Sequence, residues 1–326
     1  MKLASRREGR DGALIVVSQD TKKAVDATHI AKTMQAALDD WDNASVALQD
    51  LYDNLNQSLA RGAYDLDFNA LCAPLPRAYQ YLDGACYISH IRRNRRARGD
   101  SLPEDILEAP LIYQGISHGF MAWNDPIELP DGDLGIDFEA EIAAVTGDVP
   151  LGVSSAEATK HIKLFMLLND ISLRTLIPPE LKRSFGFLTG KPSSSLGAIA
   201  ITPDELGDLW DGKLVSGKMN CWVRGEKSGE LESGIDTPFD YGDAIAHVAQ
   251  TRAFEPGTII ALGTVSNEDE SVGFGCIGER RAVEIINEGS AKTELLQFGD
   301  VVKIDHQDYD GQSLFGPIEQ KVAPIA

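Results

Sequence analysis

The sequence predicts a mainly β protein of the α+β class, with a small N-terminal domain at residues 1–75 and a larger mixed-β domain at residues 76–326. Three observations lead to this prediction. After residue 214, most of the chain consists of short segments of alternating apolar and polar residues, bounded by Gly, Asn or Asp. Apolar residues recur at helical spacing between residues 30 and 60. Residues 73–84 (APLPRAYQYLDG), with two prolines and a glycine, are typical of a linker.

The expected N-terminal domain combines strands with helix. ALIVV (residues 13–17), followed by the polar QDTKKAV, predicts the start of a hairpin. From Ile30 to about Ala60, an apolar repeat of about 3.6 residues predicts helix. This repeat consists of Met34, Ala37, Leu38, Trp41, Val46, Leu48 and Leu51.

In the larger domain we expect three helices among many strands. Residues 155–169 predict a helix, with Ser155 as N-cap, Glu157 in the first turn and an apolar stripe behind them. Residues 201–210 open with a helix-start signal, and residues 241–253 predict a third helix. Four alternating segments predict strands of a mainly antiparallel sheet: KLVSGKMNCWVRG, GTIIALGTVS, RRAVEIINEG and GDVVKIDHQD.

The composition narrows the classes of function. The chain has 326 residues and a formal net charge of -20, which argues against a nucleic-acid partner because phosphate binding relies on basic side chains. The acidic balance tolerates a bound divalent cation. The four cysteines lack metal-site spacing and are expected to be reduced, mostly buried thiols. No run approaches the roughly 20 apolar residues of a membrane span, so we expect a cytoplasmic protein.

A candidate cation site begins in GIDFEAEIAAVTGDVP, residues 135–150. In a strand, Asp137, Glu139 and Glu141 share one face, because successive side chains alternate. They form either the solvated face of a half-buried strand or a cation site. A further carboxylate, Asp170, ends the apolar FMLLND, where a charge is expensive unless it is paired or bound to a metal. Its alternative role is the polar end of a helix. Carboxylates from two elements suit Mg²⁺, Mn²⁺ or Ca²⁺.

Lys191 has two interpretations. It lies between Gly190 and Pro192 and precedes three serines, a pattern typical of a surface turn. Beside a divalent cation, its ammonium could instead bind a substrate carboxylate or an enolate oxygen.

Five segments, in their order and spacing, resemble the fumarylacetoacetate hydrolase family over almost the whole chain: IDFEAEIAAVTGDVP, LLNDISLRTLIPPEL, GKPSSSLGAIAITPDELGDLW, GTIIALGTVSN and FGDVVKIDHQDYDGQSLFGPI. The resemblance implies a mixed β-roll, often preceded by a small SH3-like barrel, and usually a homodimer. It also implies bound Mg²⁺, Mn²⁺ or Ca²⁺ and a β-diketo or α-keto acid as substrate.

The resemblance also assigns roles to residues. Glu139 and Glu141 match the family's E-x-E metal pair, and Asp170 matches its metal-binding aspartate. Lys191 matches a lysine that polarises bound oxo groups, and Glu279 matches the glutamate that is paired with a histidine, here His90, to activate water. The residues assigned to substrate binding are Tyr113, Arg98, Arg174, Ser195 (or its neighbour Ser194) and Thr264.

The segment around His90, CYISHIRRNRRARG, departs from the family pattern. Many relatives carry a glutamate two or three residues after this histidine, where this chain has Arg92 and Arg93. Ser89 is the candidate for the place of a fourth carboxylate that some members carry nearby. The basic residues 92–98 form either a solvated helix face or, through Arg95, Arg96 or Arg98, a site for a substrate carboxylate.

The expected function is a metal-dependent hydrolase that cleaves a carbon–carbon bond in fumarylacetoacetate or an acylpyruvate, in the catabolism of aromatic compounds. One alternative applies the same chemistry to decarboxylation, hydration or isomerisation of a 2-oxo acid. Another is a binding protein that keeps the fold without turnover, prompted by Arg92 and Arg93. A third treats the acids as solvated faces without a metal. The expected partners are a small-molecule substrate and a second copy of the chain.

Overall fold

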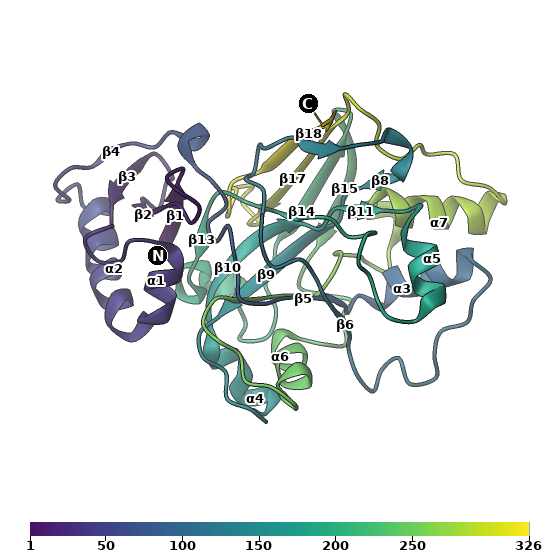
Figure 1. The fold of residues 1–326 in the computed structure, drawn as a ribbon, viewed down its shortest axis with the longest axis horizontal. Helices are drawn as coiled ribbons and strands as arrows, with labels where there is room; N and C mark the ends of the chain where they lie inside the picture. Colours follow the sequence, from purple (N-terminus) through teal and green to yellow (C-terminus); the bar gives the residue numbers. More distant parts are fainter. Residues whose placement is uncertain (326) are drawn as a thin grey trace.

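The computed structural model describes residues 1–325 and shows a small N-terminal unit beside a larger one (Figure 1). In the N-terminal unit, Leu14 and Val16 of one strand pack with Leu38 and Leu48 of two helices. The predicted hairpin and helical segment are confirmed. The elements are β1 (Lys2–Arg6), β2 (Ala13–Val17), β3 (Lys23–Asp26), α1 (Met34–Asp39), α2 (Trp41–Asn56), β4 (Tyr64–Asp65) and the 3₁₀ turn η1 (Phe68–Ala70).

The larger unit is α+β, as predicted, with helices at the margins of mixed sheets (Figure 1). Its strands are β5 (Tyr81–Ala85), β6 (Leu111–Gln114), β7 (Ile127–Leu129), β8 (Ile136–Asp137), β9 (Ala140–Thr146), β10 (Ile162–Asn169), β11 (Ser172–Leu173), β12 (Ser195–Leu196), β13 (Ala200–Ile201), β14 (Lys218–Val223), β15 (Glu226–Glu232), β16 (Thr258–Ala261), β17 (Val301–Gln307) and β18 (Ile318–Pro324). Its helices are α3 (Ile88–Ala97), α4 (Ser155–Ala158), α5 (Ile177–Arg183), α6 (Tyr241–Ala249) and α7 (Ile277–Glu288), with 3₁₀ turns η2 (Gly132–Leu134), η3 (Thr159–His161), η4 (Pro203–Leu209) and η5 (Glu270–Val272).

One large sheet joins the two units. Its strand order is β4-β3-β2-β1-β13-β10-β9-β16-β5-β6, with β12 also paired to β10. The link between the units is the pairing of Lys2 and Leu3 in β1 with Ile201 and Ala200 in β13. A second sheet has the order β15-β14-β17-β18-β7, and β8 pairs with β11. The domain boundary at residues 75/76 stays a prediction.

The middle of the large sheet is buried, and this places the site. Strands β9 and β10 pair antiparallel, with every residue of β9 buried. On the other side, β9 pairs with β16, which pairs in parallel with β5. Because both faces are covered, β9 and β10 carry nearly continuous apolar runs. Any charge at this depth therefore requires a partner.

Two predicted elements are wrong. Residues 155–169 form only the short helix α4 and the turn η3 before continuing as strand β10, because a strand buried on both faces lacks the alternation that distinguishes it from a helix. The segment RRAVEIINEG, predicted as a strand, lies mainly in helix α7, whose N-cap is Cys276 and whose C-terminal Gly289 has φ +84°.

Other predictions hold with changes. The helix-start signal at residues 201–210 begins the 3₁₀ turn η4 rather than an α-helix. The helix expected at residues 241–253 is α6, which begins with a capping box between Asp240 and Asp243. The expected linker ends in the buried strand β5. The four cysteines are free thiols, and no helix within residues 1–325 is long and apolar enough to cross a membrane.

Candidate metal centre and active site

Four buried carboxylates meet at the ends of the central strands. They belong to Asp83 in β5, Glu139 just before β9, Glu141 in β9 and Asp170 just after β10, and one oxygen from each lies within 4.8 Å of the others. The strand register brings them together: Glu141 is paired with Leu168, and the backbone N–H of Asp170 donates to the carbonyl of Glu139 at 3.0 Å. The solvated-face interpretation of Glu139 and Glu141 is therefore wrong.

The buried negative charge of this cluster favours a bound cation. Within residues 1–325, neither carboxylate oxygen of Glu141 nor Oδ1 of Asp83 has a hydrogen-bond partner. Burial, together with the neighbouring carboxylates, raises the pKa of both Asp83 and Glu141 well above the usual range. Hard divalent cations such as Mg²⁺, Mn²⁺ and Ca²⁺ prefer carboxylate oxygens. The unpartnered oxygens and the chemistry of the donor set thus fit such an ion.

Lys191 is buried beside the carboxylates, so the surface-turn interpretation is wrong. Its ammonium donates to Glu139 Oε2 at 2.6 Å, to Ser172 Oγ at 2.8 Å and to Asp170 Oδ2. Burial alone would lower the pKa of Lys191, but Asp170 and Glu139 outweigh burial and raise it above the usual range. Lys191 therefore stays protonated and offsets part of the negative charge.

Asp137 does not join the cluster, although the alternating pattern placed it beside Glu139 and Glu141. Its carboxylate accepts from the backbone N–H groups of Ile277 and Gly278, at 2.9 and 2.7 Å, at the N-terminus of α7. A carboxylate at this end of a helix is favourable because of the helix dipole. Asp137 therefore fixes α7 against the strand that leads to the cluster.

Arg174 connects Asp137 to the cluster. Its Nε donates to Asp137 Oδ2 at 2.8 Å, and its terminal nitrogen donates to Glu139 Oε1 at 2.7 Å. Burial would raise the pKa of Glu139, but Lys191 and Arg174 hold it below its usual range. Glu139 is thus held as an oriented carboxylate, and Arg174 still lines the neighbouring cavity.

His90 and Glu279 lie together, on helices α3 and α7. His90 Nδ1 is 2.9 Å from Glu279 Oε2, and Asn94 Nδ2 is 3.1 Å from His90 Nε2. An amide NH₂ only donates, so the network assigns the proton of His90 to Nδ1 and leaves Nε2 as an acceptor. Burial would raise the pKa of Glu279, but hydrogen bonds from His90, Ser266 and Arg93 keep it below its usual value.

Arg93 is the third member of this network. Its guanidinium donates to Glu279 Oε1 at 2.6 Å and to the backbone carbonyls of Asn267 and Glu268 at 2.7 and 2.8 Å. Only 6% of Arg93 is exposed, so a solvated helix face is the wrong interpretation at this position. Arg92 does lie at the surface, where it pairs with Glu268. Arg93 thus offsets the negative charge of Glu279, the carboxylate that His90 is hydrogen-bonded to.

Replacing Arg93 with methionine is expected to destabilise the fold. The change leaves the carboxylate of Glu279 buried without its guanidinium partner, and removing one member of a buried ion pair typically costs about 3–5 kcal/mol. Chemical denaturation of Arg93→Met would measure the loss. Arg92→Met is the matched control, because exposed ion pairs contribute about 0–1 kcal/mol. Equal losses in the two variants would contradict a buried ion pair at Arg93.

A cavity of about 500 Å³ opens beside these groups. Its polar lining includes Asp83, Glu139, Lys191 and His90. Its apolar lining includes Ile91, Leu111, Ile112, Ile177, Pro178, Leu181 and Phe187. The cavity thus places a carboxylate cluster, a lysine and a histidine next to a largely apolar wall, as in many small-molecule sites.

Of the residues assigned to substrate binding, some line the cavity and one does not. Tyr113 and Thr264 line the cavity, and the Tyr113 hydroxyl donates to Asp170 Oδ2 at 2.9 Å. Arg98 also lines it, but it is exposed, and its Nε lies 3.3 Å from Asp100. Ser195 is fully buried and is not part of the lining. Its neighbour Ser194 donates to Asp170 Oδ1 at 2.8 Å and is the serine in contact with the cluster.

Asp83 is the residue that the sequence interpretation missed. Ser89 was expected in the place of a fourth carboxylate, but its hydroxyl hydrogen-bonds Ser266 at 2.6 Å. The fourth carboxylate is Asp83, in a segment taken for a linker. A signal was present, because a lone Asp stands in the apolar YLDGACYI, a run typical of a buried strand.

Comparisons with known proteins identify the family of the chain. The family model described as fumarylacetoacetate (FAA) hydrolase C-terminal matches residues 80–323, and fumarylacetoacetase N-terminal domain 2 matches residues 1–77. The human mitochondrial oxaloacetate tautomerase FAHD2A is 28% identical over 161 residues, which are 48% of each protein. A 2,4-didehydro-3-deoxy-L-rhamnonate hydrolase of a Sphingomonas species is 25% identical over 158 residues, 48% of this chain and 52% of its own. The aligned part thus spans about half the length of the curated relatives.

Solved structures share the fold over the whole chain. The maleylpyruvate hydrolase from Sphingobium sp. SYK-6, in complex with manganese(II) and pyruvate, has a TM-score of 0.66 at 18% identity, with both chains covered completely. The fumarylacetoacetate hydrolase from Exiguobacterium antarcticum has a TM-score of 0.64, also at 18% identity and full coverage. Because one family model covers most of the length, the chain belongs to the fumarylacetoacetate hydrolase family, whose members include hydrolases, isomerases and tautomerases.

Proposed function

We propose that this protein is a divalent-metal-dependent hydrolase that cleaves a carbon–carbon bond in a β-diketo acid of the fumarylacetoacetate or acylpyruvate type. One observation carries the proposal: Asp83 and Glu139 of the carboxylate cluster line the same cavity as His90, which is hydrogen-bonded to Glu279. A role in aromatic catabolism and a homodimeric assembly belong to the same proposal, since the family resemblance implies them.

The proposed ligands are Asp83, Glu139, Glu141 and Asp170. When bound, Mg²⁺, Mn²⁺ or Ca²⁺ supplies Lewis-acid polarisation of the dicarbonyl oxygens. Arg174 holds Glu139 by pairing with its Oε1, while Lys191 pairs with Oε2. Lys191 places a positive charge where negative charge develops on an enolate oxygen.

His90 is the proposed general base. Its Nε2 takes a proton from water, and the water oxygen forms a bond to the acyl carbonyl carbon. The imidazolium that results is stabilised by Glu279 on Nδ1, at 2.9 Å. The carbon–carbon bond then breaks, its electron pair moves to the departing enolate, and that enolate takes up the proton from Nε2 of the imidazolium, which returns His90 to its neutral form. In the resting site Asn94 orients the imidazole ring through its contact with Nε2. Because Nε2 has a single lone pair, the Asn94 amide must turn away before water can donate to this nitrogen.

The same groups suit a second reaction class, the tautomerisation or isomerisation of a 2-oxo acid. One base that moves a proton between carbon and oxygen is sufficient for it, and no water has to attack. The oxaloacetate tautomerase activity named for the human relative favours this candidate. The third possibility is a binding protein that keeps the fold without turnover. The presence of Arg93 does not favour it, because Arg93 donates to Glu279 and leaves the pair of His90 and Glu279 in place.

An enzyme assay tests the proposal. Purified protein is incubated with fumarylacetoacetate, fumarylpyruvate, acetylpyruvate and oxaloacetate, with Mg²⁺ or Mn²⁺ and with EDTA. We expect the enol absorbance of a diketo acid to fall, with release of pyruvate or acetoacetate, and EDTA to stop the reaction. Glu141→Ala is expected to lose this activity, because a proposed ligand is gone. Glu157→Ala is the matched control, since Glu157 is exposed and forms a surface ion pair with Lys160.

Each outcome identifies a reaction class. Chromatography of the products separates cleavage, which yields two acids, from tautomerisation, which yields none. Turnover of oxaloacetate without cleavage of any diketo acid would replace the hydrolase by the second candidate. Absence of all turnover in protein with bound metal would contradict both.

A further inference from the structure

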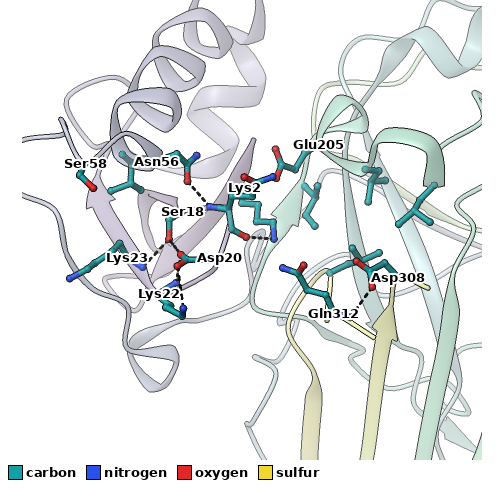
Figure 2. A pocket seen from close by; sticks show the side chains of 16 residues that line it. Lys2, Ser18, Asp20, Lys22, Lys23, Asn56, Ser58, Glu205, Asp308 and Gln312 are labelled. Carbon is teal, nitrogen blue, oxygen red and sulfur yellow. Dashed lines mark hydrogen bonds and ion pairs between the residues drawn. The ribbon is translucent and has the colours of Figure 1, made fainter. Parts of the chain in front are cut away.

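A second cavity lies between the two units, away from the candidate active site. It has a volume of about 740 Å³ and shares no lining residue with the first cavity among residues 1–325. One side is formed by the N-terminal unit, and the other by η4 and the connection between β17 and β18 (Figure 2). Among the lining residues labelled in Figure 2 are Lys2, Asp20, Glu205 and Asp308.

Lys2, the first residue of β1, is a buried amine in this cavity. Only 4% of it is exposed, and its ammonium donates to the backbone carbonyl of Gln19 at 2.8 Å. Within residues 1–325, no carboxylate oxygen lies within 4.0 Å of its Nζ, the distance at which an ion pair is counted. An ammonium has three donors, so two of them lack a protein acceptor. Burial accordingly lowers the pKa of Lys2.

The carboxylates around the cavity already have donors. Asp20 accepts from Ser18 Oγ at 2.7 Å and from the Lys22 backbone N–H at 3.1 Å. Glu205 accepts from the Tyr52 hydroxyl at 2.6 Å. Asp308 accepts from the backbone N–H groups of residues 310 and 312, at 3.0 and 2.8 Å. Each of these carboxylates thus accepts at least one hydrogen bond, whereas Lys2 keeps two donors that an anion would satisfy.

The rest of the lining indicates which kind of anion fits the cavity. Lys22 and Lys23 lie at the exposed rim, where they pair with Asp20 and Asp65. Apolar side chains cover another part of the wall: Leu55, Ile201, Leu206, Leu209 and Leu314. A bare inorganic anion leaves this apolar wall in contact with water, whereas an organic acid covers it and gains from its burial.

We propose that this cavity is a second binding site, for a small organic carboxylate whose acid group accepts hydrogen bonds from Lys2 and whose apolar body rests on the leucines. The site is formed by both units, so it depends on the junction at β1 and β13. It does not depend on the reaction at the metal centre, and it stands if that reaction proves to be a different one.

Calorimetric titration of the metal-loaded protein with benzoate tests this site. We expect saturable binding that is the same in wild type and Glu141→Ala, since Glu141 belongs to the carboxylate cluster and not to the lining of this cavity. Lys2→Met is expected to weaken binding at least about tenfold, or about 1.4 kcal/mol. Lys160→Met, which removes an exposed lysine elsewhere, is the charge-matched control and is expected to bind as wild type. Leu209→Trp, which fills the cavity and keeps Lys2, is expected to abolish binding.

The results that overturn the proposal are equally specific. Benzoate binding that survives in both Lys2→Met and Leu209→Trp, or that disappears in Glu141→Ala, would place the ligand elsewhere. Failure of benzoate to bind wild type would also overturn it. Inorganic phosphate tests whether the apolar wall contributes to affinity. If phosphate displaces benzoate at low millimolar concentration, and if Leu209→Trp does not weaken phosphate binding, the cavity is a simple anion site and not one for organic acids. If Lys2→Met does not fold, Leu209→Trp still decides.

Discussion

Replacing Asp83 with asparagine is expected to lower the affinity for Mn²⁺ at least about 10–100-fold, the loss that is typical even of residues that only support a metal ligand. The variant keeps the shape of the side chain and removes one of four buried carboxylates. Titration of free Mn²⁺ by electron paramagnetic resonance would measure the change. Ser89→Ala is the matched control, because the Ser89 hydroxyl hydrogen-bonds Ser266 and is not one of the clustered carboxylates.

A second readout separates a metal ligand from a structural acid. In EDTA-treated protein, Asp83→Asn is expected to raise the melting temperature relative to wild type, since it removes repulsion between buried carboxylates whose burial raises the pKa of Asp83 and Glu141. Higher stability without metal and weaker binding of metal are the combined signature of a ligand. Unchanged metal affinity in Asp83→Asn would exclude this residue from the site.

Replacing His90 with glutamine is expected to lower kcat by about 10²–10⁴-fold, the usual contribution of a general base. Metal affinity is expected to stay the same, because His90 bonds to Glu279 and Asn94 and not to the carboxylate cluster. Steady-state kinetics together with Mn²⁺ titration would show both results. The control is His118→Gln, since His118 is exposed and does not line the cavity.

The His90 variant also separates the two candidate reactions. If hydrolysis falls and the tautomerisation of oxaloacetate does not, His90 serves the attacking water alone. If both fall together, one base serves both proton transfers. Full hydrolytic activity in His90→Gln would contradict the role proposed here.

The sequence was most informative at charged residues in apolar segments, because such a residue is stable there only with a partner of opposite charge or a bound cation. The E-x-E pair in a strand and Asp170 after an apolar run pointed to a cation site because buried charge must be compensated. The structure brings these three together. The family resemblance, which the family models confirm, added the pairing of His90 with Glu279, which alternation and spacing alone do not indicate.

What the sequence could not show depends on tertiary contacts. Strand β10 has no alternation because both of its faces are buried, so its apolar run was taken for a helix. Asp83 was assigned to a linker because prolines nearby dominated that segment, although strand pairing with β16 buries it. Arg93 looks like its exposed neighbours in sequence, and only the packing of α3 on α7 shows that it meets Glu279.

The measurement that tests the central claim most directly is anomalous X-ray diffraction from crystals of the protein grown with Mn²⁺. The account predicts one strong manganese peak within bonding distance of carboxylate oxygens of Asp83, Glu139, Glu141 and Asp170, with Lys191 still in contact with Glu139. A manganese peak elsewhere in the molecule, or none at a concentration that supports turnover, would contradict it.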